Sequence, residues 1–579
     1  MTIIESKLTY ILPPKADGSP TTEIRALNWE DIGARKRALL SASIPQEWRV
    51  PAHLLPPDSQ DDVTAWPATS GWFTEDELRI TEQTATQIVA QLASGELQSE
   101  TVTRAFCKRA AAAHQLLRKQ VNCLSETCFE RAIATARARD EHFAKTGQPV
   151  GPLHGLPISL KDNFKLMGLD STVGFSSHVG DAAAVDSMLA KVLEEAGAIF
   201  YVKTNVPTAM MIAETINNVF GRTLNPLNRQ TTSGGSSGGE SALLVLKGSP
   251  IGVGTDIGKK RLQGSLFDGS DEEITGGSLR IPAACTGIFT LRPSSGRFPV
   301  RDCRSGMPGQ EGVMSVNGPM ARTLQDISMY SKAVIQSQPW LRDAKCHPLP
   351  WKSVQLPKKL KIGVMWDDTL VQPTPPILRA LRHTVAKLLQ AGHDVVDWRP
   401  TDMLQSLTMI GKFFLADGAA AIRKELERTG EPWRPEMEAY RHAQPMSVYD
   451  VWKLQTERTA FQNANLDRWN DAGLDGLLLP TTPYVTHKHS GRRHVAYTAV
   501  GNILDLSAVS FPTGLKVDKN IDIVGHDYEP RSDVCEAINT EYDANLLDGM
   551  PISLQLVARK LEEEKVLGMT KSVLQALSD

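Results

Sequence analysis

The sequence predicts an α/β fold built around a mixed β-sheet. Several segments place apolar residues three and four positions apart, as in Val102, Phe106 and Ala110, and this spacing is typical of helices with one buried face. Short apolar runs lie between these segments and predict buried strands. The chain has 579 residues, 41% of them apolar and 22% charged, so it can bury a sizeable core. Helices that alternate with short buried strands are typical of this fold class.

The elements follow one another in a simple order. Residues 1–75 are rich in Pro, Trp and polar residues and are expected to form an arm on the main body, with one helix at 25–44. Ser99 is a plausible N-cap for the helix expected at 99–119. The helices expected are 25–44, 81–94, 99–119, 126–145, 185–196, 376–390 and 562–577. The strands expected are 156–160, 198–202, 360–366, 393–398, 474–479 and 552–557. Residues 76–579 show no repeat or long linker and are expected to form one large domain.

Composition and charge exclude several classes of protein. The 63 Lys and Arg residues nearly balance 66 Asp and Glu residues, so neither nucleic acid nor a membrane surface is expected as a partner. The seven cysteines are odd in number and form no C-x-x-C pair, which argues against a disulfide scaffold or a structural zinc site. No signal peptide and no membrane-spanning run is evident, so a soluble, cytoplasmic enzyme is expected.

Glycine and serine crowd into two blocks within residues 222–297. The first block covers 233–240, and the second is split between 254–258 and 276–282. Such loops allow backbone N–H groups to converge on a phosphate or an oxyanion, because no Cβ prevents close approach. A flexible surface loop is the alternative for either block taken alone.

Two familiar motifs do not account for these blocks. A P-loop requires Ser or Thr after its lysine, and Gly258-Lys259-Lys260 has neither that residue nor the upstream glycine. Gly234–Gly238 has the letters of a nucleophile elbow, G-x-S-x-G. However, the preceding segment is polar and contains Pro226, which is not expected in a central strand.

Taken together, the motifs resemble the amidase signature family. The segments that carry the resemblance are Gly151–Asp162, Lys203–Pro207, Gly221–Pro226, Gly234–Gly239, Gly254–Gly258 and Gly277–Pro282. It extends from about residue 34 to the C-terminus and is strongest to the fungal acetamidases. It implies a large, twisted mixed sheet covered by helices on both faces. It also implies hydrolysis of a small monocarboxylic amide to the acid and ammonia, with no cofactor and no metal. A homodimer is compatible with it.

The resemblance also assigns roles to three residues. An amide is a poor electrophile with a poor leaving group, so its hydrolysis needs an activated nucleophile, a proton donor and an oxyanion site. By resemblance, Ser278 is the nucleophile that becomes acylated, Ser236 is a bridging serine that follows a cis peptide bond, and Lys161 is the base. Burial favours a neutral lysine, and Lys161 ends an apolar run, which fits this role.

Other positions match the family motifs with auxiliary roles. Backbone N–H groups of the oxyanion loop are expected to bind the substrate oxygen, which places Ile257, Gly258, Gly276 and Gly277 in the binding site. Met210 matches a substrate-pocket position and is alternatively a core methionine.

Three further motif positions are expected to shape the loops: Ser237, Asp256 and Arg280. Arg280 is alternatively a structural charge partner only. Cys285 is expected to be a small buried residue. His487, His489 and His494 are expected to lie in a solvated loop rather than around a metal.

The sequence departs from the family inside the nucleophile loop. Ser236 and Ser278 are 42 residues apart, 18 more than the family's 24, and the excess forms an insertion at about 259–276. One hypothesis is a genuine loop that returns to the site. The other is a translated intron, since 18 residues correspond to 54 nucleotides and Gly258-Lys259-Lys260 can be encoded with a splice-donor sequence. Because oxyanion donors require placement within about 0.5 Å, the insertion predicts impaired catalysis. An amidase for longer acyl amides and an inactive amidase-fold binding protein are the alternatives.

Overall fold

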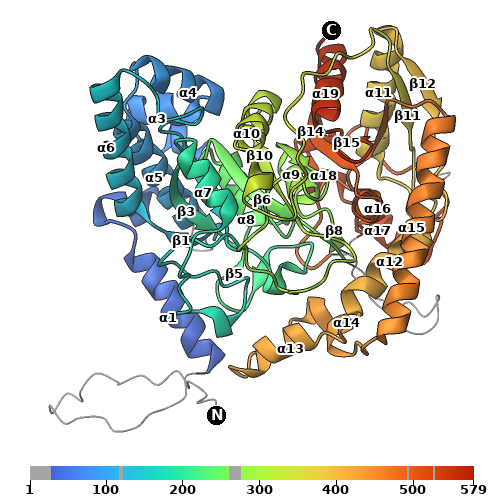
Figure 1. Ribbon diagram of the computed structural model, residues 1–579, viewed down its shortest axis with the longest axis horizontal. Coiled ribbons are helices and arrows are strands. Elements are labelled where there is room, and N and C mark those ends of the chain that lie inside the picture. The colour runs from blue at the N-terminus through green and yellow to red at the C-terminus, as the bar shows by residue number, and fades with distance from the viewer. Residues whose placement is uncertain (1–27, 117–120, 260–274, 492–493, 526–527) are drawn as a thin grey trace.

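A mixed β-sheet of 11 strands runs through the part of the chain that the computed structural model describes, residues 28–116, 121–259, 275–491, 494–525 and 528–579 (Figure 1). In spatial order the strands are β1 (Leu124–Thr127), β3 (Ile199–Thr204), β2 (Pro157–Lys161), β6 (Ile251–Asp256), β10 (Val316–Ala321), β9 (Phe289–Arg292), β14 (Ser507–Lys516), β15 (Pro551–Ala558), β13 (Gly476–Pro480), β11 (Lys361–Val364) and β12 (Asp394–Asp397). The expectation of a large mixed sheet is confirmed.

Two parallel groups position the candidate site. Strand β2 lies parallel to both β3 and β6, and β11 lies parallel to both β12 and β13, whereas the other neighbours are antiparallel. Lys161 is the last residue of β2, and Asp256 is the last residue of β6. Because parallel strands end at the same sheet edge, these two residues lie at one edge, where α/β folds place their ligand sites.

Helices surround this sheet. They are α1 (Trp29–Ala42), α2 (Trp66–Thr69), α3 (Glu75–Glu82), α4 (Ala85–Ser94), α5 (Ser99–Gln115), α6 (Phe129–Thr146), α7 (Met188–Glu195), α8 (Gly238–Val245), α9 (Arg280–Thr286), α10 (Leu324–Gln336), α11 (Pro375–Gln390), α12 (Met403–Leu415), α13 (Ala420–Glu427), α14 (Glu438–Arg441), α15 (Val448–Asp471), α16 (Ala496–Ile503), α17 (Asp533–Glu541), α18 (Ala544–Leu547) and α19 (Glu563–Ser578). In Figure 1, α3 to α6 gather on the left and α11, α15 and α19 on the right. Within the described ranges, no helix combines the length and apolarity required to cross a membrane.

Strand β15 illustrates how both faces of the sheet are covered. Leu554 and Leu556 belong to the largest apolar cluster, together with buried residues of α11 and α19. Gln555 lies between them in sequence and receives a hydrogen bond from Arg280 of α9 at 3.0 Å. Because successive side chains of a strand point to opposite faces, α11 and α19 cover one face and α9 covers the other.

Several of the expected helices have different limits in the structure, and two of them show a clear physical reason. The helix expected at 81–94 is divided into α3 and α4, because Gln83 is extended and Thr84 begins a new helix. The Thr84 side chain accepts from the backbone N–H of Gln87, whose own side chain accepts from the backbone N–H of Thr84, and this capping box fixes the start of α4. The helix expected from 126 begins only at Phe129, since the preceding residues pair with β3 as strand β1.

The expected N-cap of α5 is wrong. Ser99 is the first residue of the helix, and its hydroxyl is buried without a hydrogen-bond partner in the described structure. Asp140 of α6 takes the capping role instead. Its carboxylate accepts from the backbone N–H groups of Ser99 at 2.6 Å and Glu100 at 2.9 Å. A side chain from a neighbouring helix therefore satisfies donors that a local N-cap normally satisfies.

The expected arm is partly described. Residues 1–27 lie outside the described ranges, and α1 lies within the helix expected at 25–44. Trp48, Trp66 and Phe73 are buried in the same apolar cluster as α4 and α5. The division into an arm at 1–75 and a catalytic domain at 76–579 stays a prediction.

The Asp140 cap can be tested by substitution. Asp140→Ala is expected to lower the free energy of unfolding by about 0.5–2 kcal/mol, because two N–H groups of α5 lose their acceptor. It should also accelerate amide hydrogen exchange in the first turn of α5. Glu141→Ala removes a neighbouring carboxylate that is 69% exposed and is the control. Equal exchange in the first turn of α5 for both variants would contradict the capping role.

Candidate active site

Lys161 lies at the centre of the candidate site and has no exposed surface. Its Nζ donates to Ser236 Oγ at 2.7 Å and to Thr255 Oγ1 at 2.8 Å. Strands β2 and β6 are adjacent and parallel, so the end of β2 brings Lys161 beside Thr255 of β6. The lysine is thus held by two hydroxyl groups rather than by a carboxylate.

The electrostatic surroundings favour a neutral amine. Burial lowers the pKa of Lys161 to about 7, although the carboxylates of Asp256, Glu240 and Asp162 act in the opposite direction. Glu240 is also fully buried, and burial raises its pKa to about 8 in spite of hydrogen bonds from Ser159 and Thr204. A lysine that loses its proton near neutral pH can act as a general base.

Ser236 and Ser237 belong to the glycine-rich loop that precedes α8. The peptide bond between Gly235 and Ser236 is cis, as the family resemblance implies. Ser237 immediately precedes α8, and its backbone N–H donates to the carbonyl of Ser278 at 3.2 Å. Its hydroxyl also lies 3.3 Å from the backbone nitrogen and from the carbonyl oxygen of Thr255. The loop therefore connects the Lys161 environment to the segment that contains Ser278.

Ser278 lies just before α9 and is only 3% exposed. Gly277 has φ of 108°, and a Cβ at this position would overlap Thr498, so only glycine fits here. Among the described residues, no hydrogen bond joins Ser236 to Ser278. The structure thus brings Lys161 and Ser236 into direct contact and connects Ser278 to them through the backbone of Ser237.

Asp256 holds the backbone that leads into Ser278. Its Oδ1 accepts from the N–H groups of Gly277 at 2.9 Å and Ser278 at 3.0 Å, and from Asn502 Nδ2 at 2.9 Å. Its Oδ2 accepts from Arg280 Nε at 3.2 Å. Burial alone would raise the pKa of Asp256, but Arg280 and these donors bring it below its ordinary value. The carboxylate therefore stays ionised inside the protein.

Arg280 completes this network from α9 and is fully buried. Besides Asp256, it donates to Gln555 Oε1 at 3.0 Å, to the carbonyl of Thr498 at 3.0 Å and to Asn502 Oδ1 at 2.6 Å. It is thus a structural charge partner of Asp256 that also ties α9 to α16 and β15.

The backbone N–H groups that were expected to bind the substrate oxygen have other surroundings in the structure. Gly277 N–H already donates to Asp256, as does the N–H of the neighbouring serine. Gly258 and Gly276 pair across a short antiparallel ribbon, β7 (Gly258–Lys259) and β8 (Thr275–Gly276). The rest of the expected insertion, residues 260–274, lies outside the described ranges.

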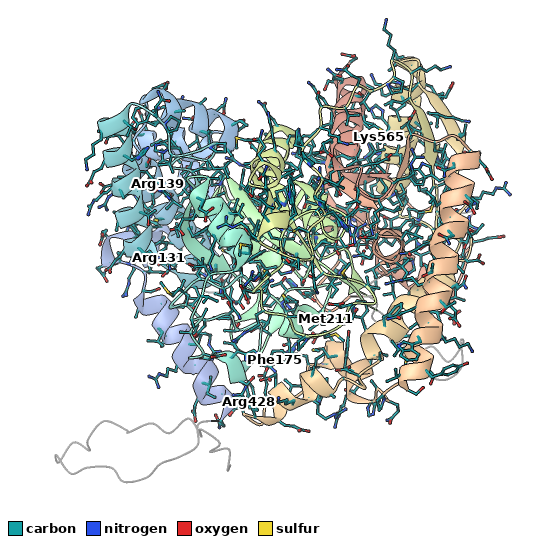
Figure 2. The ribbon with its side chains drawn as sticks, in the orientation of Figure 1. Arg131, Arg139, Phe175, Met211, Arg428 and Lys565 are labelled. Atoms are coloured by element: carbon teal, nitrogen blue, oxygen red, sulfur yellow. The ribbon has the colours of Figure 1, made fainter. Side chains whose placement is uncertain are left out.

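Met210 and Ile257 are brought together in one apolar region. Met210 is buried, and Ile257 packs against the same cluster, which also contains Phe175 and Met211 (Figure 2). Both interpretations of Met210, a pocket residue and a core methionine, fit this position.

Three residues that belong to the site were not predicted from the sequence. Glu240 is the only carboxylate in the block 233–240, and Thr255 lies within the segment Gly254–Gly258, so both positions carried a usable signal. Asn502, which donates to Asp256, lies in α16 far along the chain, and nothing in its sequence surroundings distinguishes it.

The histidine segment is not a solvated loop as expected. His487 is only 8% exposed and packs edge-on against Tyr484, with ring centroids 5.1 Å apart. His489 Nδ1 lies 2.9 Å from Glu214 Oε1, and His494 is paired with buried Asp368. Cys285 is fully buried, as expected.

Comparisons with known proteins agree on one family. The family described as amidase matches residues 101–259 and 268–567. The chain is 38% identical to an acetamidase of Emericella nidulans and 37% identical to an acetamidase of Aspergillus oryzae, each over 94% of this chain and 98% of the relative. A solved structure of fatty acid amide hydrolase superposes with a TM-score of 0.87 at 32% identity and covers 95% of both chains.

The buried pair of Arg280 and Asp256 can be tested through stability. Arg280→Met is expected to lower the free energy of unfolding by about 3–5 kcal/mol, because it leaves a buried carboxylate without its cation. Urea denaturation followed by circular dichroism measures the loss.

Arg428→Met is the matched control, since Arg428 is 51% exposed and its ion pair with Glu425 contributes at most about 1 kcal/mol (Figure 2). The double variant Asp256→Asn/Arg280→Met should be less destabilised than Arg280→Met alone. Similar losses in Arg280→Met and Arg428→Met would show that the buried pair does not matter.

Proposed function

Starting from the fact that the chain belongs to the amidase family, hydrolases that act on amides, we propose that it converts a small monocarboxylic amide of the acetamide type to the carboxylate and ammonia. The acetamidases of Emericella nidulans and Aspergillus oryzae, which it matches over nearly their whole length, support this choice of substrate. The single observation that carries the proposal is the buried hydrogen bond between Lys161 and Ser236 next to the Ser278 loop.

In the proposed reaction, Ser278 Oγ attacks the amide carbonyl and forms a tetrahedral intermediate. Its proton passes to Ser236 Oγ, whose own proton passes to Lys161 Nζ. The same path returns a proton to the leaving nitrogen, so that ammonia departs and an acyl ester remains on Ser278. Water then attacks the ester by the same route, and the carboxylate leaves. No cofactor takes part.

The surroundings of Lys161 support its role as the base. Its pKa of about 7 leaves a large share of neutral amine at physiological pH, which a base requires. The hydroxyl groups of Ser236 and Thr255 fix its position at 2.7 and 2.8 Å. Thr255 is a positioning residue in this proposal, since it contacts the base and not the nucleophile.

The insertion affects the oxyanion site rather than the base. The family match has a gap at residues 260–267, inside the segment expected as an insertion. At the ends of that segment, Gly258 and Gly276 pair in the β7–β8 ribbon instead of leading directly to Gly277, whose N–H is bound to Asp256. We propose that this arrangement leaves too few free N–H donors for an oxyanion, and that the 579-residue chain turns over poorly as a result.

An amide with a longer acyl group is the second candidate. In this alternative, the acyl chain would lie against the apolar cluster next to Ile257, which contains Met210, Met307 and Phe413. The overlap with fatty acid amide hydrolase is in line with this alternative.

The substrate and the insertion can be tested together by comparing two forms of the protein. One is the full chain, and the other lacks residues 259–276, which rejoins Gly258 to Gly277. Ammonia release from acetamide is expected to be on the order of 10²–10³ faster from the shortened chain than from the full chain, if one oxyanion donor is recovered. Hexanamide, measured in parallel, tests the longer acyl group.

The outcomes separate the alternatives. Equal activity of the full and the shortened chain would refute the proposed loss of oxyanion donors and show that the loop is genuine. If both chains fold but hydrolyse neither amide, the non-catalytic binding protein is favoured.

The role of Lys161 predicts a pH profile in whichever form of the chain turns over. Because the neutral amine is the active form, kcat/KM is expected to rise with pH through a midpoint near 7 and then to level off. Lys161→Met is expected to lower kcat by on the order of 10²–10⁴. Lys332→Met, which replaces an exposed lysine of α10, is the control and should keep the normal profile. A rate that does not change between about pH 5.5 and 8.5 would argue against a lysine base.

A further inference from the structure

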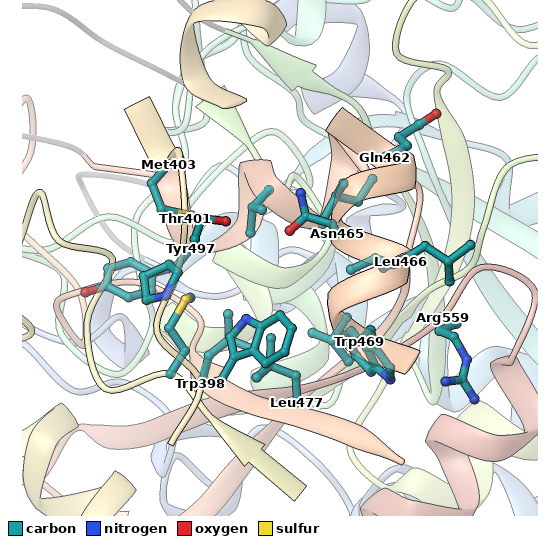
Figure 3. A pocket seen from close by; sticks show the side chains of 18 of the residues that line it. Trp398, Thr401, Met403, Gln462, Asn465, Leu466, Trp469, Leu477, Tyr497 and Arg559 are labelled. Carbon is teal, nitrogen blue, oxygen red and sulfur yellow. The ribbon is translucent and has the colours of Figure 1, made fainter. Parts of the chain in front are cut away.

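A cavity lies next to Arg280, close to the segment that contains Ser278. It has a volume of about 190 Å³, is partly open to solvent, and is lined by residues of α15, α16, the start of α12 and the strands β13 and β15 (Figure 3). Its lining does not include Lys161, Ser236 or Ser278. It does include Arg280, so the cavity meets the Asp256 network through this side chain.

The walls of this cavity are mainly aromatic and aliphatic. Trp398 and Trp469 lie with their ring centroids 6.2 Å apart and their planes inclined by 59°. Leu466 and Leu477 also line the cavity, and both are labelled in Figure 3. Such walls favour a ligand with an aromatic ring, because aromatic rings attract one another in tilted arrangements.

The carboxamides of Gln462, Asn463 and Asn465 line the cavity, and hydrogen bonds to the backbone hold two of them. Asn465 Nδ2 donates to the carbonyl of Phe461 at 2.9 Å, and Gln462 Nε2 donates to the carbonyl of Ile503 at 2.7 Å. These bonds fix both carboxamides, and no described residue donates to their side-chain oxygens. The cavity therefore presents hydrogen-bond acceptors and calls for a ligand with an O–H or N–H donor.

The charged residues around the cavity are already neutralised. Arg559 is paired with Glu562 at 3.3 Å, and Lys560 with Asp505 at 3.1 Å. Arg280 is paired with Asp256. An anionic ligand would have to compete with these carboxylates, so an uncharged ligand fits best.

From these observations, we propose that the cavity binds a small uncharged aromatic molecule with one hydrogen-bond donor, of about the size of phenol. An apolar cavity of about 150 Å³ in another protein binds benzene, so a volume of about 190 Å³ accommodates one ring and a hydroxyl group. The ring contacts the two tryptophans, and the donor reaches the carboxamide oxygen of Asn465 or Gln462.

Helix α16 connects this cavity to the nucleophile loop. Tyr497 and Val500 line the cavity, whereas Thr498 donates to the carbonyl of Gly276 and Asn502 donates to Asp256. The β7–β8 ribbon also packs against α16, and β7 packs against α12, which closes the cavity with Met403. A ligand that presses on α16 should therefore change the stability of the backbone around Gly277.

Isothermal titration calorimetry of the full chain with phenol tests the site. Saturable binding of one phenol per chain is expected, with benzoate, the charged analogue, binding about tenfold or more weakly. Leu466→Trp fills the cavity from a residue that is 44% exposed, so the fold should tolerate it, and should weaken phenol binding about tenfold or more. Leu389→Trp, at a 54% exposed leucine of α11, is the matched control and should bind like the wild type.

The absence of saturable phenol binding up to about 10 mM, or unchanged binding by a folded Leu466→Trp variant, would overturn the proposal. Hydrogen exchange of residues 276–280 tests the connection through α16, and phenol should slow it in the wild type but not in Leu466→Trp. Bound phenol without any change in exchange would refute the connection. Neither measurement depends on amide hydrolysis.

Discussion

The buried carboxylate of Asp256 is the interaction on which the candidate site depends. It ends strand β6 in the first half of the chain, and its partners come from α9 and α16. An isolated carboxylate in this interior would be costly, so Arg280 and Asn502 have to be in place before the chain can bury it. Because Asn502 belongs to the last third of the sequence, the backbone around Ser278 takes its position only when both halves of the sheet have assembled.

A second constraint concerns the proton balance around Lys161. The amine is surrounded by three carboxylates that would each favour its charged form. Glu240 exerts this effect only when it is ionised, and its raised pKa of about 8 keeps it largely protonated near neutral pH. A neutral Glu240 attracts the ammonium less, so the burial of this acid and the low pKa of the lysine support each other.

The parts of the structure that could be predicted from the sequence are those with a regular apolar pattern. Strands such as β2 and β15 are mainly apolar, whereas β6 was missed because glycines interrupt it. A Cβ on Gly252 would overlap the carboxylate of Glu240, so close packing of α8 on β6 requires the residue that weakens the strand pattern. The three proposed catalytic residues could be named only from the resemblance of their motifs to a family, since a lone lysine or serine carries no pattern. Asn502 and Asp140 could not be named at all, because the first depends on the packing of α16 and the second caps a helix other than its own.

The position of the insertion separates two requirements of the site: the placement of the three proposed catalytic side chains and the placement of the oxyanion N–H groups. Lys161 and Ser236 are fixed by β2, β6 and the loop before α8, none of which includes the insertion. Ser278 is fixed by Asp256 and α9, and these contacts persist because the β7–β8 ribbon returns the chain to Gly277 close to where it left at Gly258. The insertion separates Gly258 from Gly277, and both glycines belong to the loop whose N–H groups are expected to face an oxyanion. In the proposed mechanism, an added segment at this point therefore leaves the proposed base, bridging serine and nucleophile in place while it removes the electrostatic stabilisation that their chemistry needs.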